Sequence, residues 1–179
     1  MMSDPADSRI LLRLCKMGGK EQDFIADAFR DNWVVPLGPN VNGFEKDLEK
    51  FVLPEGSLKR ICALSSGTSA IHLGLVMLGV DKDDEVLVQS LTFSASANPV
   101  VYQGATPVFI DSEELTWNID PSILDHAIVE RKKATGKIPK AIIPVDLYGM
   151  PGNYEEILHV AQKWEIPVLE DAAEAFGSR

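Results

Sequence analysis

From Arg60 onward, short apolar runs alternate with helical patterns, and this alternation constrains the fold more than any other feature of the sequence. The runs lack the polar–apolar alternation of a strand that has one face in water. They are typical of parallel strands that are covered on both faces and joined by helical crossovers. The runs lie at residues 61–64, 86–88, 107–110, 141–145 and 166–169.

The segments between these runs carry helix signals. Residues 68–78 place apolar side chains on one stripe, and a second helix is predicted to begin near Ser96. Asp120 directly before Pro121 predicts the N-cap of a third helix, and Asn153 is the predicted cap of a fourth. We therefore predict an α/β fold of three layers, a mostly parallel sheet with helices on both faces.

The first part of the chain has a different pattern. Residues 23–30 and 43–52 are predicted helices, and the Pro- and Gly-rich segment 34–39 between them is predicted to be a surface arm. We place a domain boundary after residue 59. On this division, residues 1–59 form a helical arm, and residues 60–179 form the first part of the α/β domain.

Composition argues against several classes of function. The chain has 27 acidic and 17 basic residues, a net charge of -10 and no basic cluster that offsets it, so we expect no binding to nucleic acid. No apolar run approaches the length of a membrane span and no targeting segment is recognisable, so we expect a cytoplasmic protein with no membrane contact. Two cysteines and three scattered histidines predict neither a disulfide framework nor a metal site. Of the cysteines, Cys15 and Cys62, we expect the second to be a small core residue.

Ligands of open parallel sheets bind beyond the carboxyl ends of the strands, so the residues after each run are the candidates. Residues 65–69 are small and hydroxylic and open into a helix, where backbone N–H groups can hold a phosphate. Phe93 comes after the second run and can stack on a flat ring, and Asp171 comes after the fifth and can face a cationic group. Each has a simpler explanation, which is helix capping for the serines and for Asp171 and core packing for Phe93.

Together these residues suit one flat, phosphorylated heterocycle such as pyridoxal phosphate, whose pyridine nitrogen an aspartate keeps protonated. Short motifs also succeed one another in a characteristic order, at residues 66–70, 92–93, 104–111, 148–151 and 170–174. In this order they resemble the DegT/DnrJ/EryC1/StrS family of sugar aminotransferases, which are fold-type I pyridoxal-phosphate enzymes. The resemblance extends over residues 33–179.

The resemblance implies a set of residues that hold the cofactor. Three would bind its phosphate, an aromatic ring would stack on its pyridine ring, and an aspartate would pair with the pyridine nitrogen. A glutamate, at a position where many members have glutamine, would lie near the ring hydroxyl. In this order, the residues are Gly67, Thr68 and Ser69, Phe93, Asp171, and Glu174.

The resemblance also implies a reaction and partners. Such enzymes transfer an amino group from glutamate to a keto-sugar attached to a nucleotide, and the products feed surface polysaccharide or glycan synthesis. Members are homodimers with active sites at the interface. The helical arm at residues 1–59 would then serve as a dimerisation segment.

One part of the family's site is not expected in this chain. The Schiff-base lysine of the family lies downstream of residues 170–174, and the sequence ends at Arg179. We therefore expect the isolated chain to be inactive unless it joins a chain that supplies the missing C-terminal part. Among the lysines that are present, several lie on a helix end, a loop or the polar side of a helix and do not match that position: Lys132, Lys133, Lys137, Lys140 and Lys163.

The resemblance predicts an incomplete sheet as well. In the family, two further strands lie between the run at 61–64 and the other four runs, and a small domain comes after them. Without these strands we expect unpaired sheet edges, so that the isolated chain is either unstable or covered by partner chains.

Two other functions stay open. The chain could be a truncated or split-gene product that acts only as a subunit or pairing module. A nicotinamide-dependent oxidoreductase would suit the α/β pattern, but the sequence lacks the glycine fingerprint and the acidic ribose ligand of that class.

Overall fold

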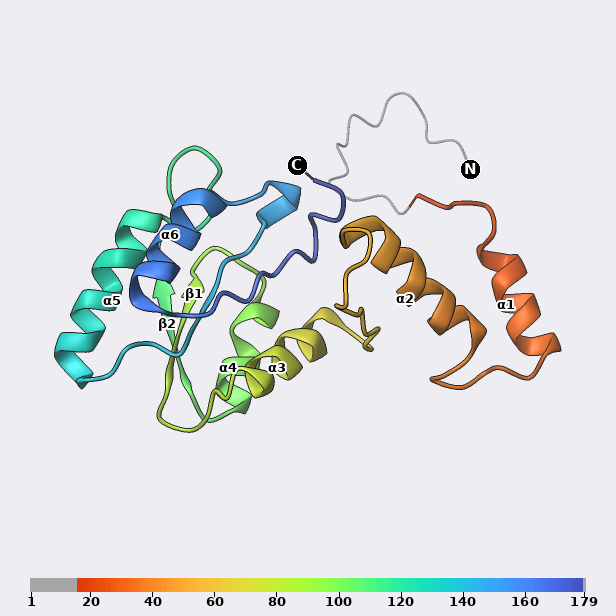
Figure 1. Ribbon diagram of the computed structural model, residues 1–179, viewed down its shortest axis with the longest axis horizontal. Helices are drawn as coiled ribbons and strands as arrows, with labels where there is room; N and C mark the ends of the chain where they lie inside the picture. Colours follow the sequence, from red (N-terminus) through yellow and green to blue (C-terminus); the bar gives the residue numbers. More distant parts are fainter. Residues whose placement is uncertain (1–15, 179) are drawn as a thin grey trace, which may run out of the picture. The chain divides into compact units, whose positions relative to one another are not determined.

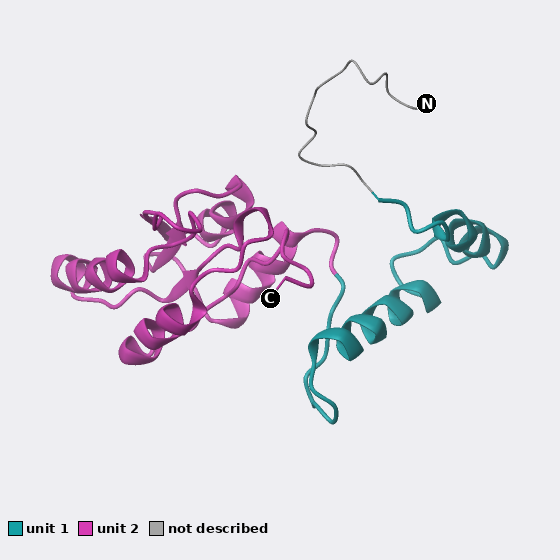
Figure 2. Cartoon of the chain, turned by 90° about the horizontal axis from the view of Figure 1, so that it is seen from above, with its two compact units in different colours: residues 1–63 teal, residues 64–179 magenta. Residues whose placement is uncertain are grey.

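The structure is a computed structural model that describes residues 16–178, so Cys15 lies outside the described residues. The chain divides into two compact units, residues 1–63 and residues 64–179, which Figure 2 colours separately. The division falls within the apolar run at 61–64. The residues proposed from the sequence to hold a cofactor all belong to the second unit.

The described part of the first unit contains two helices, α1 (Glu21–Arg30) and α2 (Pro39–Val52). Both helices were predicted, although α2 begins at Pro39 rather than at residue 43. A proline is well placed there, because the first N–H groups of a helix have no partner within it. Neither helix has a buried residue, and large apolar side chains along both are exposed, namely Phe24, Phe29, Phe44 and Phe51.

The apolar run at 61–64 is not a strand, and this prediction is wrong for the described structure. The N–H of Ile61 donates to Glu49 Oε1 at 3.2 Å, and the N–H of Ala63 donates to Glu45 Oε1 at 2.8 Å. Carboxylates of α2 therefore bind the donors that a strand would offer to a neighbouring strand. The predicted core position of Cys62 is also wrong, because this residue is exposed.

The second unit contains a sheet of three parallel strands in the order β2–β1–β3. These strands confirm the predicted runs at 86–88, 107–110 and 141–145, the last of which is shorter than predicted. The strands are β1 (Glu85–Gln89), β2 (Thr106–Ile110) and β3 (Ala141–Ile143).

The fifth run continues this sheet through isolated bridges instead of a full strand. Val168 bridges Ile142 and Asp171 bridges Val145, both in parallel orientation. The N–H of Ile142 donates to Pro167 O at 3.0 Å. Proline has no N–H to return such a bond, which limits the regular ladder here. The run lies beside β3 in parallel orientation, so the carboxyl ends of the strands and of this run lie at one edge of the sheet.

Helices cover both faces of the sheet and produce three layers, as Figure 1 shows. Along β1, Val86 and Val88 pack in one core and Leu87 in the other, because successive side chains of a strand point to opposite faces. This confirms the predicted α/β class. The first core is covered by α3 (Gly67–Met77) and α4 (Asn98–Tyr102), the second by α5 (Pro121–Thr135) and α6 (Tyr154–Trp164).

The predicted caps begin the longer helices. Asp120 Oδ1 accepts hydrogen bonds from the N–H groups of Ser122 and Ile123 at 2.7 and 3.2 Å at the start of α5. Asn153 Oδ1 accepts from the N–H of Glu156 at 3.4 Å at the start of α6. Within the described residues, no helix is long and apolar enough to cross a membrane, and no side-chain cluster could hold a metal ion.

Candidate functional site at the carboxyl ends of the strands

Chain direction places the start of α3 at the edge where the strands end. The helix ends at Met77, and β1 begins shortly afterwards at Glu85, so the end of α3 lies near the amino end of β1. Its first turn therefore lies at the opposite edge, level with the carboxyl ends. This edge is where open parallel sheets bind ligands.

The start of α3 contains the predicted phosphate-binding residues. Ser66 is the N-cap, and its Oγ accepts from the N–H of Ser69 at 3.1 Å, so capping is confirmed for this serine. Ser69 Oγ is also 3.0 Å from Ser66 Oγ. Apart from the residues next to it in the chain and the backbone of its own helix, no described heavy atom lies within 4 Å of the point where a Cβ of Gly67 would stand. A small anion could approach the N–H groups of this turn at the positive end of the helix.

Phe93 lies at the start of the turn that comes after β1. Its carbonyl accepts from the N–H of Ser96 at 3.1 Å, which closes a short 3-10 turn, η1 (Ser94–Ser96). The side chain is 79% exposed, so the core-packing explanation is wrong. An exposed ring at this edge can cover a flat ligand.

Asp171 is held in place by two hydrogen bonds. Ser96 Oγ donates to Asp171 Oδ2 at 2.6 Å, and the N–H of Ala173 donates to Oδ1 at 3.3 Å. The residue is only 9% exposed. No helix begins in residues 171–178, so helix capping does not explain this aspartate. The bond to Ser96 places its carboxylate beside the turn that Phe93 opens.

Ser96 is a site residue that sequence reasoning missed. The sequence marked it only as the start of a helix, although its side chain is 1% exposed and also lies 2.8 Å from Thr92 Oγ1. The hydroxyl pair at Thr92 and Ser96, four residues apart after an apolar strand, was the available signal. Its importance depends on Asp171, which is 75 residues away in the chain.

Glu174 stabilises a second turn at the same edge. Its Oε2 accepts from the N–H of Tyr148 at 2.8 Å, within the turn η2 (Leu147–Gly149). Tyr148 has a φ of 52°, a left-handed conformation that costs energy for a bulky residue. A carboxylate that accepts from this N–H offsets part of that cost. The contact of Glu174 with a ring hydroxyl stays a prediction.

Other acidic groups surround Asp171. The N–H of Asp146 donates to the Asp171 carbonyl at 3.1 Å, and Asp146 Oδ1 accepts from Tyr154 Oη at 3.0 Å. Partial burial raises the pKa of Glu170, and the charge of Asp146 and a hydrogen bond with it raise this pKa further. Burial and the charge of Asp146 likewise raise the pKa of Tyr154. Asp146, Glu170 and Tyr154 thus form an interacting cluster next to Asp171.

Gln89 and Asn118 form a buried network that sequence reasoning also missed. Gln89 Oε1 accepts from the N–H groups of Ile119 and Val145 at 2.8 and 3.3 Å, and its Nε2 donates to Asn118 Oδ1 at 3.3 Å. Asn118 Nδ2 donates to the carbonyl of Met150 at 2.7 Å. The network joins the end of β1 to the loops that precede α5 and α6. A glutamine that ends an apolar strand was its only sequence signal.

The lysines of residues 64–178 lie away from this edge. They are at the ends of helices or just before strands, which is the amino-end side of the sheet. Lys163 is exposed, as its place on the polar side of the helix predicts, and it forms an ion pair with Asp125 Oδ1 at 2.8 Å. This part of the structure therefore fits the phosphate, the ring and the nitrogen of the cofactor, but not a covalent attachment. The lysines are Lys82, Lys132, Lys133, Lys137, Lys140 and Lys163.

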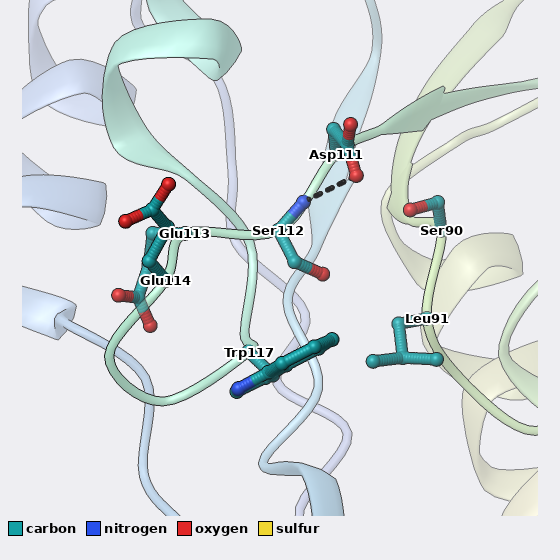
Figure 3. A pocket seen from close by; sticks show the side chains of 7 residues that line it. All are labelled: Ser90, Leu91, Asp111, Ser112, Glu113, Glu114 and Trp117. Atoms are coloured by element: carbon teal, nitrogen blue, oxygen red, sulfur yellow. Dashed lines mark hydrogen bonds between the residues drawn. The ribbon is translucent and has the colours of Figure 1, made fainter.

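A cavity of about 640 Å³ also opens at this edge, beyond the ends of β1 and β2 (Figure 3). None of the residues proposed to hold the cofactor lines it. Its walls come from the residues directly after β1 and from the loop between β2 and α5, and they include Leu91, Asp111 and Trp117.

Comparison with known proteins identifies the family. The sequence profile of the DegT/DnrJ/EryC1/StrS aminotransferase family matches residues 16–179. The chain belongs to this family. It is 47% identical over 170 residues to the Bacillus subtilis protein named "Putative pyridoxal phosphate-dependent aminotransferase EpsN", a match that covers 95% of this chain and 42% of that protein. The family membership confirms the resemblance seen in the sequence.

Two further relatives show the extent of the similarity. The GDP-perosamine synthase of Caulobacter vibrioides is 38% identical over 170 residues, which cover 95% of this chain and 43% of that enzyme. The crystal structure of a DegT DnrJ EryC1 StrS aminotransferase from Brucella abortus superposes with a TM-score of 0.80 at 33% identity, over 87% of this chain and 40% of that one. The chain thus spans less than half the length of the curated relatives that it matches.

Proposed function

We propose that this chain forms the cofactor-holding part of a pyridoxal-phosphate-dependent aminotransferase that moves an amino group from glutamate to a nucleotide-linked keto-sugar. The family and the name of the EpsN relative support the cofactor. The GDP-perosamine synthase relative supports a nucleotide-linked sugar as the substrate class. Products of such a reaction would feed surface polysaccharide or glycan synthesis.

The observation that carries this proposal is the anchored carboxylate of Asp171. Because Ser96 and Ala173 hold its two oxygens, the carboxylate has a fixed direction and stays beside the turn of Phe93. Such a carboxylate can hold a proton on the nitrogen of a pyridine ring. When bound, pyridoxal phosphate supplies an electron sink for amino-group chemistry, and the protonated nitrogen strengthens it.

Three further groups would hold the cofactor without covalent bonds. The first turn of α3, at Gly67, Thr68 and Ser69, would bind the phosphate through N–H groups and hydroxyls. Phe93 would cover one face of the ring and exclude water from it. Glu174 would keep the adjacent turn in place, with a ring-hydroxyl contact as its secondary role. Residues 64–178 offer no lysine at this edge, so we propose that this chain alone does not turn over.

Binding of pyridoxamine phosphate by the chain tests the site. This ligand has the phosphate and the ring but needs no lysine, and equilibrium dialysis measures its affinity. Replacing Asp171 by asparagine removes a charge-assisted bond, so we expect Asp171→Asn to weaken binding by about tenfold. The control Asp47→Asn, in an exposed part of α2, should bind as the unchanged chain does. Equal affinity of Asp171→Asn and the unchanged chain would refute the nitrogen assignment.

Catalysis offers a second readout. In any enzyme that joins this segment to the family's lysine, Asp171→Ala should abolish amino transfer from glutamate to the nucleotide-linked sugar. The pyridine nitrogen then loses the group that keeps it protonated. Turnover at the unchanged rate would show that another group serves the nitrogen.

A second candidate function is a non-catalytic subunit or pairing module. The exposed apolar side chains of α1 and α2 favour it, because both helices lack buried residues in the described chain. Adding pyridoxal phosphate and dialysing separates the candidates. An absorption band that survives dialysis would show that a lysine here does attach the cofactor. A reading frame that continues past Arg179 into a lysine-bearing segment would favour the aminotransferase.

We also propose that the protein acts as a homodimer, or in a complex with a chain that supplies the remaining parts of the site. The apolar side chains of α1 and α2 support an interface in the first unit. Exposed phenylalanines on consecutive helices are typical of surfaces that another chain covers.

A further inference from the structure

The loop between β2 and α5 is a rigid hairpin that forms one wall of the cavity in Figure 3. Ser112 and Ile119 form an antiparallel bridge, and the N–H of Glu113 donates to the carbonyl of Asn118 at 2.9 Å. Asn118 is itself fixed in the buried network with Gln89. The backbone of the loop is therefore held in place before any ligand arrives, which lowers the entropy cost of binding.

Two large apolar side chains border the cavity. Trp117, near the end of the hairpin, has a φ of 66° and is 62% exposed. Leu91, just after β1, is 43% exposed, and Figure 3 shows it opposite the indole ring. A volume of about 640 Å³ is in the usual range for small-molecule sites.

The polar side chains of the cavity are acidic. Asp111, Glu113 and Glu114 line it, and no lysine or arginine does. The side-chain hydrogen bond from Thr116 and backbone bonds lower the pKa of Glu113, so this group is ionised at neutral pH. The Glu113 carboxylate already accepts from the N–H groups of Leu115 and Thr116 and from Thr116 Oγ1. Asp111 and Glu114 are therefore the carboxylates that would face a ligand, and together they give the cavity a negative potential.

A hydroxyl adds a second, independent sign of a ligand. Ser112 Oγ is buried and has no hydrogen-bond partner in the protein. In Figure 3 it points toward the space between Trp117 and Ser90. A buried hydroxyl without a partner costs free energy, and a donor on a bound molecule would remove this cost.

We propose that this cavity binds a small organic cation, an amine or guanidinium compound with an apolar body. The indole of Trp117 would bind the cation through its π face, the carboxylates would neutralise it, and Ser112 Oγ would accept one of its N–H bonds. The same carboxylates repel phosphate, glutamate and nucleotide diphosphates. The cavity therefore serves a ligand other than the cofactor and the substrates proposed above, and its binding does not depend on them.

Agmatine, which carries both a guanidinium and an ammonium group, is the probe that tests this site. Nitrogen-15 NMR of the chain resolves the indole signals of its tryptophans, and Trp117→Phe assigns the signal of Trp117. Agmatine should shift this signal in a saturable way with a dissociation constant of about 1 mM. Raising the ionic strength should weaken binding, because ion pairs near the surface are screened.

Charge variants decide whether the carboxylates form the site. We expect Glu114→Gln to weaken agmatine binding about threefold, and the pair Asp111→Asn and Glu114→Gln about tenfold. Asparagine at position 111 can still accept the N–H of Ser112, so the hairpin should be retained. Glu155→Gln, at an exposed position of α6, is the matched control and should bind agmatine as the unchanged chain does. No shift of the Trp117 signal, an equal shift with L-glutamate, or equal affinities of Glu114→Gln and Glu155→Gln would each overturn the proposal.

Discussion

Asp125 is a residue whose charge joins two helices. Both of its oxygens accept from Lys163 Nζ at 2.8 Å, and Oδ1 accepts from Trp164 Nε1 at 2.7 Å. The ammonium groups of Lys132 and Lys163 lie 5.2 and 5.3 Å from the ring centroid of Trp164. The bond from Lys163, and after it the bond from Trp164, lowers the pKa of Asp125. This carboxylate of α5 therefore binds α6 in its ionised form.

We expect Asp125→Asn to lower the free energy of unfolding by about 1 kcal/mol near neutral pH. The folded-state pKa is below the ordinary value of 3.8, so the contribution is fully present above 3.8 and is lost as the pH falls through the folded-state pKa. Urea unfolding of both chains, near neutral pH and at about pH 3, measures the difference. The difference in the free energy of unfolding between Asp125→Asn and the unchanged chain should be smaller at about pH 3 than near neutral pH.

Asp47→Asn provides the control for this prediction. Asp47 pairs with Lys50 at 3.2 Å on the surface of α2, where both side chains are more than three-quarters exposed. Its loss should leave the free energy of unfolding unchanged, because solvent screens such a pair. If Asp125→Asn lowers the free energy of unfolding by the same amount in acid as near neutral pH, the assigned ion pair is contradicted.

Residue-level expectations from the sequence held where the interaction is local. Asp120 and Asn153 cap the helices they were predicted to cap, because a cap bonds to an N–H only two or three residues away. Cys62 was expected in a core and is exposed, and the core-packing alternative for Phe93 fails for the same reason. Burial depends on which distant segments cover a side chain, and hydrophobicity alone does not specify them.

At the scale of elements, Gln89 connects the strand end to two loops. It is fully buried, and its amide accepts and donates at the same time. A satisfied network of this kind fixes the position of each segment that it joins. The residues after the strands, including the turn bound by Glu174, depend on that position.

We expect Gln89→Leu to lower the free energy of unfolding by about 3 kcal/mol, because it leaves the N–H groups of Ile119 and Val145 without their acceptor. Leucine nearly preserves the volume, so a cavity does not account for the loss. Urea unfolding gives the change, and hydrogen exchange should be faster at the amide of Ile119. Gln162→Leu, on the exposed side of α6, should change neither quantity. A stability loss without faster exchange at Ile119 would point to another cause.

The runs at 61–64 and 166–169 show why elements of similar composition differ. Both are apolar and short, and the sequence predicts a strand for each. The second lies beside β3 and forms parallel bridges, whereas the first bonds to carboxylates of α2. A strand needs a neighbour, so an apolar run predicts a strand only when another segment is placed to pair with it.

At the scale of the whole molecule, the exposed apolar surface is the dominant feature. The helices of the first unit bury no residue, and their phenylalanines are more than half exposed. Such a surface costs free energy in water and favours association with another chain. The sheet edge beside residues 166–171 also favours association with another chain, because its backbone groups can pair with another strand.

We therefore expect the chain to self-associate, with a mass above that of one chain in sedimentation equilibrium. Phe29→Asp together with Phe44→Asp should shift the equilibrium toward the monomer, because the two carboxylates would need to be desolvated in the interface. Leu115→Asp, at an exposed position of the second unit, serves as the control and should leave the mass unchanged. A monomer that unfolds in one cooperative urea transition, with a slope normal for its size, would contradict both the self-association and the expected instability of the isolated chain.

The sequence by itself determined the alternation of strands and helices, the helix caps, the α/β class and the family. These depend on periodicity, on bonds between residues a few positions apart and on short motifs, all of which are present in the local order of residues. Only the tertiary structure decided that Ser96 anchors Asp171, that the run at 61–64 does not pair, and that Leu91 and Trp117 border one acidic cavity. These features arise where distant segments meet, and which segments meet is decided by packing of the whole core.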